Sequence, residues 1–303
     1  MKRFSWTAVT LLLVLSSYGQ IKVTLLGTGT PQPIMERFGP SILVQAGSEV
    51  LLFDAGRGCL QRLRQINQSY DKISALFLTH LHSDHIVGLP DLWLTGWLIS
   101  ERKEPLKIFG PQGTGNLIKY LRKAFAYDIS IRAEDDKAFA EGSKFLVNEI
   151  QQGVIYEKNG VKVIAITVDH FPVKPAFGYR IEYHGHSVVL SGDTRYSENL
   201  IHYAKGTDLI IHEVALAPDT LSKTDPKYHI LAHHTTPEQA AKVFNEVKPG
   251  YAAYSHIVNL YGQNIQDLLK RTKTAYTGPL VIGEDLMSFS IGDTVSVIPW
   301  KNK

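Results

Sequence analysis

Residues 79–85 read Thr-His-Leu-His-Ser-Asp-His, which places three imidazoles and one carboxylate directly after the apolar run ISALFL. His80 and His82 fall in a turn that follows a predicted strand, where their spacing lets two imidazoles converge on one ion. Asp84 and His85 come a turn later and can serve a second ion. Catalytic zinc is held by nitrogen and oxygen ligands of this kind, with one position left open for water. The segment therefore predicts a hydrolytic metal site rather than a solvated polar loop.

Three further side chains of ligand type follow apolar runs elsewhere in the chain. His170 ends VKVIAITVDH, Asp193 ends VVLSGD, and His256 ends YAAYSH. Each comes after a predicted strand and before a polar loop, so all three can gather at one edge of the sheets. A single histidine at a strand end is as often structural as functional, but the repeated pattern favours a shared site.

The elements that must position these side chains are short strands and amphipathic helices. Apolar runs predict strands, several of them buried on both faces, at residues 21–31, 41–56 (two strands), 73–79, 161–168, 186–192, 208–214, 251–257 and 280–291. Helical spacing predicts helices at residues 58–66, 113–128, 236–247 and 263–276, and Thr236-Pro237 is a strong helix start. Strands from both halves, separated by helices, predict a layered sandwich with sheets inside and helices outside.

The segments THLHSDH and SGDT, together with the spaced His170 and His256, resemble the metallo-β-lactamase superfamily over nearly the whole chain after residue 19. The resemblance implies an α/β fold, the four-layer αββα sandwich, with a dinuclear metal site at the edge of the sheets. It also implies two sets of ligands and a bridge, namely His80, His82 and His170 for one ion, Asp84, His85 and His256 for the other, and Asp193 between them. The oxygen-reducing diiron branch has Glu where this chain has His82, which favours zinc hydrolysis. Two Zn²⁺ ions are expected, with Mn²⁺ or Fe²⁺ as alternatives.

Two divalent ions roughly 3.5–4 Å apart lower the pKa of a bridging water and produce hydroxide near neutral pH. Asp84 either acts as a ligand alone or also accepts a proton from that water. LAHHTT and IIHEVAL resemble the HST and HEAT motifs of the ribonuclease Z branch. The resemblance implies that His234 donates a proton to the leaving oxygen and that Glu213 orients it and raises its pKa. His233 is the competing candidate for the acid.

The closer likeness is to the arylsulfatase-like branch of the superfamily, carried by LLGTGTP, LLFDAGRGCLQRL, FLTHLHSDHIVGLPDLWLTGW, VDHFPVKPAFGYRIEY and SGDTRYSENLI. It predicts a hydrolase that cleaves sulfate or phosphate esters of small molecules. Lys174 and Arg195 are candidate anion contacts, with solvated surface as the alternative. Trp93 and Trp97 are candidates for lining an apolar or aryl pocket, but core packing is the favoured interpretation.

Other functions remain open at this point. The first alternative is a ribonuclease Z-like phosphodiesterase or nuclease, followed by another ester or lactone hydrolase, an amidohydrolase barrel, or a metal-binding protein without catalysis. Ribonuclease Z carries a tRNA-gripping arm between the strands that correspond to GYRIE and GDT, whereas FGYRIEYHGHSVVLSGDT leaves room only for a tight turn. The net charge of +3, from 32 basic and 29 acidic residues, gives no separate argument for a nucleic-acid partner. Nucleic acid is therefore not expected as a partner.

The N-terminus predicts export. Residues 1–19 have two basic residues, an apolar stretch and small residues before Gln20, which is typical of a secretory signal peptide. The stretch is too short to span a bilayer, so no stable membrane anchor is expected; an uncleaved tether is the alternative. Residues 20–303 then form one hydrolase domain in the periplasm or outside the cell. Cys59 is the single cysteine, which excludes an intramolecular disulfide and fits a small buried residue. A homodimer is an expectation from the resemblance only.

Overall fold

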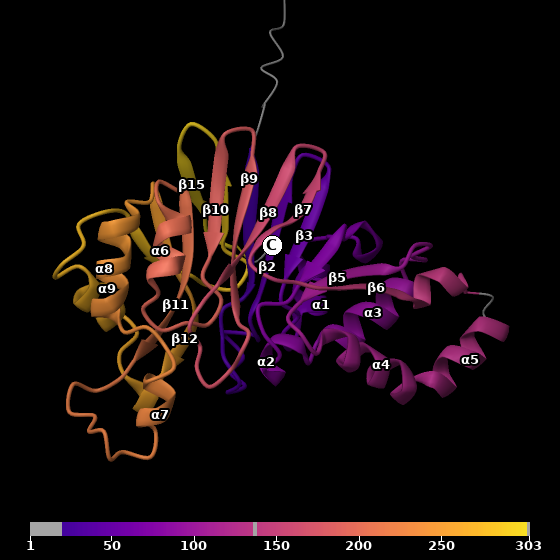
Figure 1. Cartoon of the computed structure of the whole chain (residues 1–303), viewed down its shortest axis with the longest axis horizontal. Coiled ribbons are helices and arrows are strands. Elements are labelled where there is room, and N and C mark those ends of the chain that lie inside the picture. The colour runs from indigo at the N-terminus through magenta and orange to yellow at the C-terminus, as the bar shows by residue number, and fades with distance from the viewer. Residues whose placement is uncertain (1–19, 136–137, 302–303) are drawn as a thin grey trace, which may run out of the picture.

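The short apolar runs of the sequence form two β-sheets that face each other across a shared core, with helices on both outer faces (Figure 1). The structure, a computed structural model, describes residues 20–135 and 138–301. The first sheet has eight strands, in the order β15 (Val295–Ile298), β14 (Ser288–Ile291), β1 (Ile21–Gly27), β2 (Ser41–Ala46), β3 (Glu49–Phe53), β4 (Ala75–Phe77), β5 (Leu106–Gly110) and β6 (Phe145–Glu149). The second has seven, in the order β13 (Leu280–Ile282), β12 (Tyr251–Asn259), β11 (Leu209–Leu216), β10 (His186–Leu190), β9 (Phe177–Tyr183), β8 (Val161–Thr167) and β7 (Gly153–Lys158). This is the expected four-layer αββα sandwich.

The expected signal peptide, residues 1–19, lies outside the described residues, so its cleavage and the export of the chain stay predictions. Within the described residues, none of the helices combines the length and the apolar character that crossing a bilayer requires.

In each sheet one of the inner strands is buried along its whole length. Every residue of β4 and of β11 is buried. One face of each sheet packs into the shared core, and the other face packs against helices. Burial on both faces explains why these strands read as continuous apolar runs rather than as alternating patterns.

The helices form the two outer layers. The α-helices of the described residues are α1 (Cys59–Gln65), α2 (Ser83–Ile86), α3 (Leu89–Leu98), α4 (Thr114–Ala124), α5 (Ala126–Glu134), α6 (Glu198–Ala204), α7 (Tyr228–Leu231), α8 (Pro237–Val247) and α9 (Asp267–Thr272), with short 3₁₀ turns at η1 (Tyr70–Lys72), η2 (Ala140–Ser143) and η3 (Leu260–Gly262). Apolar faces of α1, α3 and α4 cover the eight-stranded sheet, and those of α6, α8 and α9 cover the seven-stranded sheet (Figure 1). Helix α8 starts as expected, with Pro237 at its first position and a capping box between Thr236 and Gln239.

Two expected elements are divided in the structure. Residues 280–291 predict one strand but form β13 in one sheet and β14 in the other. Asp285 fixes the turn between them, because its carboxylate accepts hydrogen bonds from the backbone N–H groups of Thr28 over 2.9 Å and Phe38 over 2.8 Å. Residues 113–128 predict one helix but form α4 and α5.

Strand directions bring the functional loops to one edge of the sandwich. Strands β3 to β6 run parallel to one another, and so do β10 to β13. The carboxyl ends of parallel strands meet at the same edge of a sheet, where ligand sites of α/β folds are usually found. The loops after β4 and β10 therefore lie close together at that edge.

Candidate metal centre

The segment after β4 supplies the first ligand-type side chains. His80 and His82 occupy the turn between β4 and the one-turn helix α2. That helix carries Asp84 and His85, and both side chains are buried. The motif is thereby divided into two pairs, His80 with His82 in the turn and Asp84 with His85 in the helix. The side chains of the two pairs point to neighbouring positions.

The second sheet supplies the remaining three. His170 follows β8 in a tight turn, where its carbonyl accepts a hydrogen bond from the Val173 N–H over 2.9 Å. Asp193 follows β10. His256 lies inside β12, where the pairing with β11 shifts by one residue and its φ is +42°. A bulge of this kind re-aims a side chain, and here it brings the His256 imidazole to 3.3 Å from the Asp84 carboxylate.

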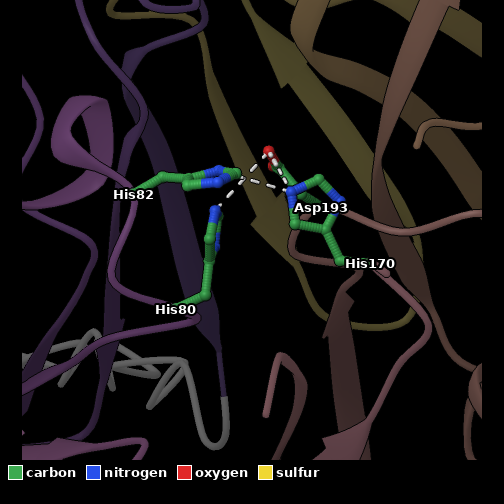
Figure 2. Close-up of side chains that lie close together, drawn as sticks. All are labelled: His80, His82, His170 and Asp193. Carbon is green, nitrogen blue, oxygen red and sulfur yellow. Dashed lines mark hydrogen bonds and ion pairs between the residues drawn. The ribbon is translucent and has the colours of Figure 1, made fainter. Parts of the chain in front are cut away.

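The structure brings the seven side chains into two adjoining groups, one of which Figure 2 shows converging. In each group the ligand atoms lie within 4.8 Å of one another; the groups are His80, His82, His170 and Asp193, and Asp84, His85 and His256. The Oδ2 atom of Asp193 lies 3.9 Å from Nε2 of His80 and 3.3 Å from Nε2 of His256. This one carboxylate therefore reaches both groups.

The donor atoms fit divalent metal ions. Two buried imidazole nitrogens that face the other ligands make no hydrogen bond with any described residue, namely Nε2 of His80 and Nε2 of His85. Buried polar atoms normally have a partner, and imidazole nitrogens with carboxylate oxygens are the donor set that zinc and similar ions take.

Metal binding requires neutral imidazoles and ionised carboxylates, and the surroundings of His80 and Asp193 favour these forms. Burial lowers the pKa of His80 well below its ordinary value. Burial acts the other way on Asp193, but the neighbouring His256 and His85 outweigh it and hold the pKa of this carboxyl well below its usual range. At His85 burial is outweighed by the carboxylates of Asp193 and Asp54, which raise the pKa well above its ordinary value.

A histidine–glutamate pair lies beside the two groups. The Nδ1 of His234 donates a hydrogen bond to Oε2 of Glu213 over 3.0 Å, and Oε1 accepts another from the Thr235 N–H over 2.7 Å. Because Nδ1 faces Glu213, Nε2 is the nitrogen that can face a substrate. His233 lies differently: its backbone carbonyl accepts a hydrogen bond from Nδ1 of His170 over 3.1 Å. Among the described residues, the imidazole paired with Glu213 is that of His234.

Asp54 and Thr79 support the ligands from behind, and sequence reasoning missed both. The Asp54 carboxylate accepts hydrogen bonds from Nδ1 of His85 and from the Thr79 N–H, each over 2.8 Å. The Thr79 hydroxyl lies 3.0 Å from Nδ1 of His80. Carboxylates behind ligand histidines fix the orientation and tautomer of the ring. The signal was present in FDAG, where an acidic residue comes just after an apolar strand, as Asp193 does in VVLSGD.

The two tryptophans considered for a substrate pocket lie elsewhere. Trp93 and Trp97 are on α3 and have exposed fractions of 0% and 1%. Their Nε1 atoms donate hydrogen bonds to the carbonyls of Ser143 and Phe139. Residues four apart share one face of a helix, and on α3 that is the buried face. The pocket prediction is therefore wrong for both, and core packing is their role.

Lys174 and Arg195 lie near His170, but only one keeps its charge available. The guanidinium of Arg195 donates hydrogen bonds to the carbonyls of Ala232 over 2.6 Å and Phe171 over 3.1 Å, which ties two loops together. The Nζ of Lys174 lies 5.2 Å from the centre of the Phe171 ring and makes no ion pair with a described residue. Arg195 also pairs with the Asp169 carboxylate over 3.7 Å, so of the two Lys174 is the cation without a carboxylate partner among the described residues.

The comparisons with known proteins agree with this geometry. A family model described as the anti-Pycsar protein Apyc1 matches residues 21–240. The metallo-β-lactamase fold protein YhfI of Bacillus subtilis has a TM-score of 0.71 at 20% identity, over 89% of this chain and 99% of that one. Ribonuclease Z of Mycolicibacterium gilvum is 36% identical over 284 residues, which are 92% of this chain and 99% of that protein. The chain belongs to the metallo-β-lactamase superfamily. Within this superfamily it is a hydrolase of the Apyc1 family, related to ribonuclease Z.

The human short-form tRNase Z has the same fold as this chain, with a TM-score of 0.65 at 21% identity over 88% of this chain and 98% of the human protein. These relatives correct one expectation from the sequence. Nucleic acid was not expected as a partner, but the Mycolicibacterium gilvum relative, matched over almost its full length, is a ribonuclease.

The structure shows how far from the metal groups a tRNA-gripping arm would begin. The turn between β9 and β10 is indeed tight, with His184 and Gly185 alone outside the two strands. Strand β9 starts beside the metal edge, where the Phe177 N–H donates a hydrogen bond to the Thr79 carbonyl. At about 3.3 Å per residue the turn lies about 20 Å away. An arm at that place leaves the metal groups themselves unchanged.

Proposed function

We propose that this chain is a metal-dependent phosphodiesterase that hydrolyses phosphodiester bonds of RNA, with His234 as the general acid. The observation that carries the proposal is the His234–Glu213 pair beside two ligand groups that share Asp193. A ribose hydroxyl is a poor leaving group and gains much from protonation, whereas a phenol leaving an aryl sulfate gains little. The pair therefore supports a nuclease more than an arylsulfatase, and the ribonuclease Z relative supports the same choice.

The proposed metal sites use the two groups as they lie in the structure. His80, His82 and His170 would hold one ion, Asp84, His85 and His256 the other, and Asp193 would bridge them. Zn²⁺ is proposed because imidazole ligands predominate. Bound divalent ions supply an activated water and stabilise charge that develops on the phosphate oxygens.

The protein side chains have separate tasks in this proposal. The Glu213 carboxylate holds Nδ1 of His234 and keeps the imidazole protonated, so that Nε2 can donate a proton to the leaving oxygen. Asp54 fixes the ring of His85 through Nδ1. Asp84 acts as a ligand, because its carboxylate already faces His256 over 3.3 Å and His85 over 3.6 Å.

The proposal is tested by turnover of three substrates with the zinc-loaded protein: a short single-stranded RNA, bis(4-nitrophenyl) phosphate and 4-nitrophenyl sulfate. The expected result is cleavage of both phosphodiesters and loss of that activity in His80→Ala. The control His202→Ala removes an exposed histidine of α6 and is expected to behave as wild type. Cleavage of the sulfate alone would contradict the proposal and restore the arylsulfatase interpretation.

A further inference from the structure

A large cavity opens beside the ligand His170 and has no part in the chemistry described so far. Its volume is about 1370 Å³, more than the roughly 300–1,000 Å³ of common small-ligand pockets. Its walls are formed by the β6–β7 connection, by the loop from β8 to β9, and by residues just before α4 and around the start of α6. The side chains that matter are Gln112, Gln151, Gln152, Phe171, Lys174 and Asn199. A cavity of this size adjoining the metal edge has room for more than the scissile phosphate.

Two amides form a fixed part of the wall, and two others are available. The Gln152 side-chain oxygen accepts hydrogen bonds from the Thr167 N–H over 3.1 Å and from Nδ2 of Asn199 over 2.7 Å. Gln112 and Gln151 are exposed and make no hydrogen bond with another described residue. Each of these free amides offers both a donor and an acceptor, the combination that pairs with the edge of a nucleobase.

Phe171 presents an aromatic ring at this cavity. The side chain is 49% exposed although it directly follows the buried His170. Its backbone is held in place, because the N–H donates to the Asp169 carboxylate over 3.0 Å and the carbonyl accepts from Arg195 over 3.1 Å. An exposed aromatic ring on a fixed backbone is a platform on which a base can stack.

Among the described charged side chains around the cavity, one cation is free to contact a phosphate. The Glu149 carboxylate accepts hydrogen bonds from the N–H groups of Gly113 and Gly115, and Asp169 is engaged by the Phe171 N–H. Lys174 has no carboxylate partner among the described residues, and its Nζ lies 5.2 Å from the Phe171 ring centre. Lys174 therefore offers a positive charge next to the aromatic platform, while the Glu149 carboxylate is held by backbone N–H groups.

We infer that this cavity binds the nucleotide adjacent to the scissile phosphodiester, in single-stranded form. The base stacks on Phe171, the amides of Gln112 and Gln151 contact its edge, and Lys174 contacts the next phosphate. An unpaired base is required because the stacking face and the pairing edge must both be free. The inference rests on the proposed phosphodiesterase function and names its substrate class.

The test compares two diesters that share a leaving group and differ in the nucleoside: uridine 5′-(4-nitrophenyl) phosphate and methyl 4-nitrophenyl phosphate. The zinc-loaded wild type should show the higher kcat/KM for the uridine ester. Phe171→Ala should lower the ratio of the two kcat/KM values about tenfold, because it removes one stacked base. Phe171→Trp should keep the ratio, and Gln112→Ala with Gln151→Ala should lower it.

Phe139→Ala is the matched control, since Phe139 is 46% exposed with the Lys103 Nζ 4.7 Å from its ring centre, yet does not line this cavity. It should leave both kcat/KM values as in wild type. Equal kcat/KM values for the two esters in wild type, or an equal loss on both in Phe171→Ala, would overturn the inference and leave the phosphodiesterase proposal intact. Turnover of neither ester would refute both.

Discussion

The Nδ1 atom of His234 lies 3.0 Å from Oε2 of Glu213, and the Glu213 carboxylate is almost completely buried. Burial by itself lowers the pKa of His234, but the Glu213 charge outweighs it and raises this pKa to about 9. His234 therefore carries its proton at neutral pH, which a general acid must do. The acid His234 lies in the loop before α8, and Glu213, which controls its proton, lies on β11.

Replacing Glu213 by Gln should shift the pH dependence of RNA cleavage. The protonated acid is present below the pKa of His234 and is lost above it, so the alkaline limb of kcat follows this pKa. Removing the Glu213 charge lowers that pKa, and the alkaline limb should move to lower pH. The measurement is kcat against pH for wild type and Glu213→Gln. An unchanged alkaline limb would show that another group sets it.

Removal of His234 should lower kcat more on a substrate with a poor leaving group than on one with a good leaving group. His234→Ala should lower kcat about 100-fold on RNA, within the usual range for a general acid, and much less on bis(4-nitrophenyl) phosphate, whose nitrophenolate leaves without a proton. His233→Ala is the matched control and should retain most activity on both substrates. Equal losses on both substrates would speak against proton donation by His234.

Metal removal should destabilise the fold, because the ligands come from loops of both sheets. Binding at about 100 times Kd contributes about 2.7 kcal/mol to the free energy of unfolding, and this corresponds to a Tm shift of about 5 °C or more. Thermal unfolding with a chelator and after re-addition of Zn²⁺ measures it. In Asp193→Asn the rise in Tm on adding Zn²⁺ should be much smaller than in wild type, since Asp193 reaches both groups.

Asp54 should control metal affinity without contacting the metal. Loss of such a supporting carboxylate typically costs 10–100-fold in affinity. Competition with a chromogenic zinc chelator should therefore show weaker binding in Asp54→Asn. Asp219→Asn, which alters an exposed aspartate far along the chain, is the control. Equal zinc affinities of Asp54→Asn and wild type would contradict the role given to this hydrogen bond.

Trp93 offers a test of core packing against substrate contact. Trp93→Phe removes buried volume and should lower the free energy of unfolding by about 1–3 kcal/mol. Urea unfolding measures the loss, and kcat/KM on folded protein should stay near the wild-type value. A selective rise in KM with unchanged stability would return Trp93 to the substrate pocket.

Much of the fold and the ligand set follows from local sequence patterns. His80 and Asp193 come just after apolar strands, and parallel strands gather such ends at one edge. Their types and places could therefore be predicted together. His256 was expected at the end of a strand but lies inside β12. The capped start of α8 was predictable for a similar reason, since Thr236 and Pro237 act within one helical turn.

Other features depend on partners distant in the chain. The division of residues 280–291 between two sheets is set by Asp285 and its contacts with Thr28 and Phe38, more than 240 residues earlier. Asp54 follows an apolar strand as the ligands do, but its role as a support for His85 appears only once His85 is placed against it. The substrate was the weakest prediction, because it depends on loops around the site rather than on the metal ligands.

His256 is an extra residue in β12 that has no partner in β11, which makes it a β-bulge. Glu213 and Val214 are consecutive in β11, whereas their partners Ser255 and Ile257 have His256 between them. Deleting His256 would restore an uninterrupted ladder and leave the partners on either side unchanged. The sheet gains nothing from this residue, and its positive φ carries a conformational cost. Without bound metal, selection for stability alone would remove it, so a thermostable variant selected in the presence of a chelator and without a screen for activity is expected to lose the imidazole that faces Asp84.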